Sequence, residues 1–173
     1  MKTLQTIQKT CQVFQVLTKV AEILCIVGAS LCAAVGLCAL GWSSGGTVFS
    51  LFGKPVENFL KGDLRQTCAG MLAAGLALTA HAILFGFAHG YLKAEQAEGT
   101  PFTQTGAARL NRLGIRCLYL PAIAAALAGA VAAWQGAEGI ADGVRFGSPA
   151  TGVVLILAAL VFRYGAELER GTK

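Results

Sequence analysis

Four long runs of apolar residues constrain the fold of this chain more than any other feature. They cover about residues 23–42, 68–92, 117–134 and 148–164, and the first two contain no Lys, Arg, Asp or Glu. A helix needs roughly 20 mostly apolar residues to cross the hydrocarbon core of a membrane. Each run is therefore predicted to be a transmembrane helix. The fourth is the shortest, and it spans the membrane only if Arg163 at its end extends to the headgroups or if the helix begins near Gly147.

The composition indicates the same class of protein. Hydrophobic residues make up 55% of the chain, charged residues make up 13%, and the mean hydropathy is +0.62, whereas a soluble domain is about 25% charged. The first run also resembles the core of a secretory signal peptide, but the stretch up to Glu22 is too long and too polar for one. We predict an all-α, polytopic integral membrane protein in which residues 1–173 form a single membrane domain.

The basic residues predict how the spans are oriented. Of the fourteen Lys and Arg residues, ten lie on the side that carries both termini and the loop after the second span. These ten are Lys2, Lys9, Lys19, Lys93, Arg109, Arg112, Arg116, Arg163, Arg170 and Lys173. Since Lys and Arg are enriched in cytoplasmic loops, both termini are expected in the cytoplasm. The net charge of +5 then reflects topology and attraction to anionic headgroups, and no direct nucleic-acid partner is expected.

The first 22 residues show an amphipathic pattern. Leu4, Ile7, Cys11 and Phe14 recur at helical spacing, and Gln and Lys residues occupy the other side. This pattern fits an amphipathic helix that lies on the inner membrane surface. It fits equally well a first span that extends into the cytoplasm, because periodicity cannot separate the two.

A second amphipathic segment, GTPFTQTGAARLNRLG, covers residues 99–114 after the second span. Pro101 ends the preceding structure, and Thr103 is predicted to cap a new helix. Its apolar face carries Ala107, Leu110 and Leu113, and its basic residues are Arg109, Arg112 and Arg116. We predict a short cytoplasmic amphipathic helix that feeds the third span. It either anchors that span or contacts lipid phosphates and an acidic protein partner.

The candidate intramembrane polar residues are the two histidines of the second span, His81 and His89. For His81 we favour an interhelical hydrogen bond over proton transfer or metal ligation. The two side chains lack the spacing of an obvious chelate. Gly86 and Gly90, in the same span, match the small-xxx-small motif of close helix crossings.

The sequence favours binding over catalysis. The predicted spans contain no carboxylate, and the chain has no phosphate loop, nucleophile elbow or zinc-protease helix. The six cysteines have no Cys-x-x-Cys pair and are expected to pack as small hydrophobes. No catalytic residue, metal or cofactor is therefore predicted, and the protein is not expected to be an enzyme.

Two sequence boxes carry a family resemblance. They are Gly99-x-Pro101-Phe102-Thr103 with Leu110 and Leu113-Gly114 downstream, and Phe162-Arg163-Tyr164-Gly165-Ala166-Glu167-Leu168. Together they resemble a family of small bacterial four-span membrane proteins that is catalogued as domain of unknown function 2975. Members typically continue with a Gln and an acidic tail, whereas this chain continues with Glu169-Arg170-Gly171. The resemblance implies a membrane protein that holds or releases a helix-turn-helix regulator, and it carries over no catalytic residue.

The leading hypothesis is a regulatory or sensory membrane partner of a cytoplasmic protein, located in the bacterial inner membrane. The contact residues expected for a partner or for lipid are Arg109, Arg112, Arg116, Arg163, Tyr164 and Glu167. Arg163 and Glu167 are one helical turn apart and are expected to pair, and Tyr164 fits an aromatic belt. The alternative is a small oligomeric transporter or channel in which His81 lines a path.

Overall fold

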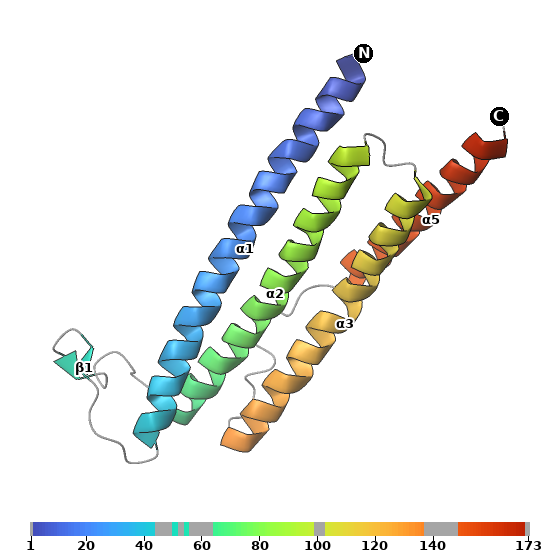
Figure 1. Cartoon of the computed structure of the whole chain (residues 1–173). Coiled ribbons are helices and arrows are strands. Elements are labelled where there is room, and N and C mark those ends of the chain that lie inside the picture. The colour runs from blue at the N-terminus through green and yellow to red at the C-terminus, as the bar shows by residue number, and fades with distance from the viewer. Residues whose placement is uncertain are drawn as a thin grey trace. The chain divides into compact units, whose positions relative to one another are not determined.

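Four helices and one short antiparallel strand pair make up the part of the chain that the structure describes. The structure is a computed structural model, and it describes residues 2–43, 50–51, 54–55, 64–98, 103–136 and 149–171. The helices are α1 (Lys2–Ser43), α2 (Leu64–Glu98), α3 (Gln104–Gln135) and α5 (Pro149–Gly171) (Figure 1). Strands β1 (Ser50–Leu51) and β2 (Lys54–Pro55) pair with Ser50 opposite Pro55. Residues 99–102, including Pro101, lie outside the described residues.

All four helices are long and apolar enough to cross a membrane, which confirms the predicted all-α, multi-pass class. Their apolar stretches are Gln12–Cys38, Gln66–Ala97, Gln104–Gln135 and Pro149–Glu167. Large apolar side chains on these helices face outward: Leu24, Leu31 and Val154 are each more than 60% exposed. A soluble protein rarely exposes so much contiguous apolar surface, whereas lipid-facing helices present it to the hydrocarbon.

Helix α1 is one continuous helix of 42 residues. At 1.5 Å per residue it is about 63 Å long, roughly twice the ~30 Å hydrocarbon core. Residues 2–27 contain neither Gly nor Pro, so nothing in the sequence breaks the helix between the polar start and the apolar run. The backbone therefore runs without a break from the N-terminal stretch into the first apolar run, and both interpretations of that stretch stay predictions. The side chains of Leu4, Ile7 and Cys11 lie outside the described ones.

The segment after the second span is likewise the beginning of a long helix. Helix α3 has 32 residues and continues through Pro121, so no break separates the predicted short helix from the third span. Thr103 caps this helix as predicted. Its Oγ1 accepts a hydrogen bond from the Gly106 N–H at 2.9 Å, and its carbonyl oxygen accepts one from the Ala107 N–H at 3.0 Å.

The chain divides into two compact units. Unit 1 consists of Met1–Leu24, His81–Pro121 and Gly147–Lys173, and unit 2 consists of Cys25–Ala80 and Ala122–Phe146. Unit 1 contains ten basic and five acidic residues, and unit 2 contains four of each, so the net charge of +5 belongs entirely to unit 1. The ten basic residues of unit 1 are the same ten that the sequence assigns to the cytoplasmic side.

Small residues fill the interior of unit 2. The buried side chains are Cys68, Ala69, Ala73, Ala77 and Ala80 of α2 and Ala124, Ala128 and Ala132 of α3. Most recur every fourth residue and so form a stripe on one face of each helix. Between α1 and α2, a Cβ placed on Gly36 would lie 2.9 Å from Leu72 Cδ2, and one placed on Gly28 would lie 3.0 Å from Leu78 Cδ1. Such small residues let helices pack closely in lipid, where van der Waals contact drives association.

In unit 1 two helix backbones approach closely at Gly114 of α3 and Gly152 of α5. A Cβ placed on Gly114 would lie 3.0 Å from the Gly152 carbonyl oxygen, and one placed on Gly152 would lie 2.9 Å from the Gly114 carbonyl oxygen. Gly86 and Gly90, which match the small-xxx-small motif, do not make such an approach. A Cβ on Gly90 would meet nothing within 4 Å, and the nearest atom to one on Gly86 is a Glu22 carboxylate oxygen at 3.6 Å.

Candidate functional site

The arginines at the start of α3 lie beside a cavity of about 310 Å³ in unit 1. Its lining includes Arg109, Arg112 and Arg116 of α3 and Phe87, Gly90 and Tyr91 of α2. The arginines share one side of α3 because they are three and four residues apart. The predicted apolar positions of the same turns, Ala107, Leu110 and Leu113, are buried. The amphipathic pattern of the sequence thus matches the buried apolar side chains, of which Leu113 also lines the cavity, and the arginines beside them.

Arg116 is held in this cavity by an aromatic ring. Its guanidinium carbon lies 3.7 Å from the centroid of the Phe87 ring, which is a close cation–π contact. The N–H groups of a guanidinium lie in its plane and point outward from its edges. Stacking on a ring covers only the face of the group, so these N–H groups remain available to an anion. Arg116 is half-buried and Arg112 is exposed.

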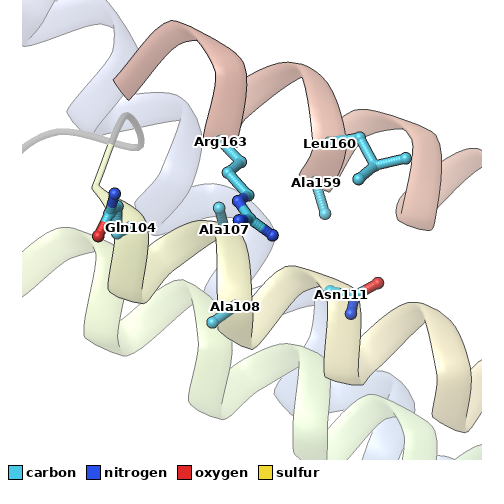
Figure 2. Close-up of a pocket in the computed structure, with 7 residues that line it drawn as sticks. All are labelled: Gln104, Ala107, Ala108, Asn111, Ala159, Leu160 and Arg163. Carbon is cyan, nitrogen blue, oxygen red and sulfur yellow. The ribbon is translucent and has the colours of Figure 1, made fainter. Parts of the chain in front are cut away.

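A second cavity, of about 290 Å³, lies between α3 and α5 in unit 1. Figure 2 shows Gln104 and Asn111 on α3 and the Arg163 side chain extending from α5. Ala107, Ala108 and Ala159 supply the space, because alanine leaves room between the two helices. Two amides and one guanidinium on an alanine floor can bind a polar or acidic side chain of a partner.

The predicted ion pair at the end of α5 is confirmed. Arg163 Nε lies 3.2 Å from Glu167 Oε1, and both side chains are more than half exposed. Tyr164 is 65% exposed. Of the three residues, only Arg163 is among those that line the cavity of Figure 2. Because an exposed pair of this kind contributes little to stability, Arg163 can exchange Glu167 for an acidic group of a binding partner at little cost.

Two carboxylates of the helices were not singled out from the sequence. The predicted spans contain none, but the apolar stretches of the structure are longer and include Glu22 and Glu95. Glu22 is bonded to Lys19 at 3.1 Å. Glu95 is only 9% exposed, and its Oε1 would lie 2.5 Å from a Cβ on Gly106. Glu95 therefore lies against the first turn of α3.

The structure does not bring the two histidines together. They are eight residues apart on α2, which is about 12 Å along the helix axis. His89 Nδ1 lies 3.2 Å from the Gln15 carbonyl oxygen of α1, so this ring joins two helices in the way that we expected for His81. His81 is half-buried, and its role in a transport path stays a prediction.

The described cysteines are free thiols. Cys68, in unit 2, is buried; its Sγ lies 3.3 Å from the Gly36 carbonyl oxygen, to which it donates, and accepts from Gln135 Nε2 at 3.6 Å. It therefore joins three helices as a packing residue. Among the described residues, no three His, Cys, Asp or Glu side chains are grouped so that they could hold a metal ion.

These features define a helical, multi-pass membrane protein with two polar cavities in its charged unit. Comparison with known protein families, with curated proteins and with solved structures finds no match. The function is therefore argued from the cavities and the charges.

Proposed function

We propose that this protein is a non-catalytic membrane protein that binds a cytoplasmic protein and acts as its regulatory or sensory partner. The observation that carries the proposal is the location of the whole net charge of +5 in unit 1. Basic residues predict the cytoplasmic side of a membrane protein. Both termini, the start of α3 and the end of α5 then face the cytoplasm, where a soluble partner can reach them.

The contact surface in this proposal is the cavity between α3 and α5. Gln104, Asn111 and Arg163 line it, and they offer hydrogen-bond donors and one positive charge to an acidic or amide side chain. The family resemblance supports the same function, since it implies a small bacterial four-span membrane protein that works with a helix-turn-helix regulator. We accordingly place the protein in the bacterial cytoplasmic membrane.

Site-specific photocrosslinking in intact cells tests this proposal. A photoreactive residue at Gln104 samples the cavity, and one at Val154 of α5, which is 62% exposed on the apolar surface, serves as the matched control. We expect an adduct with one soluble protein at Gln104 and none at Val154. In a second arm, Arg163→Glu reverses the charge of the cavity and should abolish the Gln104 adduct. Equal labelling at the two positions, or no soluble adduct at Gln104, contradicts the proposal.

A further inference from the structure

We propose that the cavity between α2 and α3 is a binding site for a phosphate group. It uses residues other than those of the cavity in Figure 2, and it goes beyond the partner-binding function. The two residues that carry the inference are Arg112 and Arg116. They lie one helical turn apart on α3, so two guanidinium groups reach one cavity from the same side.

The chemistry of the lining selects an anion. Three of its side chains are arginines, and no Asp or Glu is among the described residues that line it. Glu22 borders this lining, since one of its carboxylate oxygens lies 3.6 Å from a Cβ placed on Gly86, but its charge is offset by the ion pair with Lys19 at 3.1 Å. Guanidinium groups bind phosphate oxygens through paired, charge-assisted hydrogen bonds. A lining of this kind therefore favours phosphate over a neutral or cationic ligand.

The geometry prepares the site for that ligand. The stacking of Arg116 on Phe87, at 3.7 Å, fixes one guanidinium before binding, so less side-chain entropy is lost when a phosphate arrives. Gly90 keeps the cavity open, because a Cβ at this position would meet nothing within 4 Å. A volume of about 310 Å³ is at the low end of the range for small-molecule sites, which suits one headgroup and not a whole lipid.

The phosphate can belong to an anionic phospholipid headgroup or to a free phosphate compound. Lipid is close at hand, because Phe87 of the lining and Ile83, one turn before it, are exposed apolar residues on a membrane-spanning helix. Both sources present the same oxygen atoms to the arginines, and they can be separated by experiment.

The experiment is a lipid titration of the full-length chain, purified in detergent and measured by native mass spectrometry. Phosphatidylglycerol is the probe, and phosphatidylcholine, whose headgroup has no net charge, is the reference. We expect phosphatidylglycerol to bind more tightly than phosphatidylcholine. Arg112→Gln and Arg116→Gln should each weaken its binding by about tenfold, the loss expected for a hydrogen bond to a charged group.

Two further variants separate the site from general charge effects. Gly90→Leu leaves all arginines in place and fills the cavity, so it should weaken phosphatidylglycerol binding even if Arg116→Gln fails to fold. Lys9→Gln removes one positive charge from an exposed side chain of α1 that does not line the cavity, and it should leave binding unchanged. The inference is overturned if Lys9→Gln weakens binding as much as Arg112→Gln, or if wild type binds the two lipids equally and shows no arginine-dependent response to inorganic phosphate.

Inorganic phosphate in excess identifies the source. If it displaces phosphatidylglycerol and raises the unfolding temperature of wild type but not of Arg112→Gln, the site accepts free phosphate. If it has no effect while phosphatidylglycerol binds in an arginine-dependent way, the ligand is a lipid headgroup. Either result supports a phosphate site. Failure of the partner-binding proposal appears separately, as the absence of the Gln104 adduct.

Discussion

The close approach of α3 and α5 at Gly114 and Gly152 gives the sharpest prediction about stability. A Cβ on Gly114 would lie 2.7 Å from Ile156 Cγ1, 3.0 Å from the Gly152 carbonyl oxygen and 3.1 Å from the Ile156 backbone nitrogen. Non-bonded carbon atoms normally stay about 3.5–4.0 Å apart. The Ile156 side chain can rotate away, but the two backbone atoms move only if α5 itself shifts.

Gly114→Ala should therefore destabilise the protein through overpacking, which costs about 1–3 kcal/mol. Alanine also forms helix better than glycine, by up to about 1 kcal/mol, and this gain opposes the steric cost. Gly129→Ala is the matched control on the same helix, because a Cβ on Gly129 would meet nothing within 4 Å. The propensity gain is common to both variants, so the difference between their free energies of unfolding isolates the steric cost.

The assay is reversible unfolding in mixed detergent micelles, followed by circular dichroism. We expect Gly129→Ala to be as stable as wild type or more stable, and Gly114→Ala to be about 1–3 kcal/mol less stable than Gly129→Ala. Gly152→Ala separates the same two helices, so the double variant should lose less stability than the sum of the two single losses. If Gly114→Ala and Gly129→Ala unfold together, α3 and α5 do not meet at these glycines and the reasoning is wrong.

Three smaller predictions follow from single contacts. Thr103→Ala removes the acceptor for the Gly106 N–H and should cost about 0.5–2 kcal/mol, seen as faster hydrogen exchange in the first turn of α3 with no change in α5. Arg163→Gln breaks an exposed pair and should change the free energy of unfolding by less than about 0.5 kcal/mol; a larger loss would show that Arg163 has a structural role. His89→Leu removes the bond to the Gln15 carbonyl oxygen and should cost about 0.6 kcal/mol, measured in the same unfolding assay, where no change would argue against that bond.

The parts of the fold that depend on local chemistry could be predicted from the sequence. The four membrane-spanning helices follow from the length of the apolar runs, and the Thr103 cap follows from its side chain and its position before a helical pattern. The Arg163–Glu167 pair follows from helical spacing alone. The spans depend on the composition of one segment, and the residues of the cap and of the ion pair lie within one or two turns of each other. Sequence spacing therefore identifies both partners.

Features that depend on a second helix could not be predicted in this way. Gly114 and Gly152 are far apart in the sequence, and neither forms a Gly-xxx-Gly motif with a neighbour. The stacking of Arg116 on Phe87 also joins two helices, and the sequence pattern contains nothing that pairs them. The continuity of α1 was open for another reason, because an amphipathic pattern is the same for a surface helix and for an extended span.

The glycines show why the positions of the cavities could not be predicted from the sequence. Gly86 and Gly90 match the small-xxx-small motif, but Gly86 faces the Glu22 carboxylate and Gly90 borders the arginine cavity. Gly114, outside any motif, makes the close helix contact instead. Because glycine has no side chain, a neighbouring backbone can come close to it or a cavity can form beside it. The position of the neighbouring helix determines which of the two occurs. Gly114→Ala should therefore lower stability, whereas Gly90→Leu should weaken anion binding, so the two variants together separate packing from recognition within unit 1.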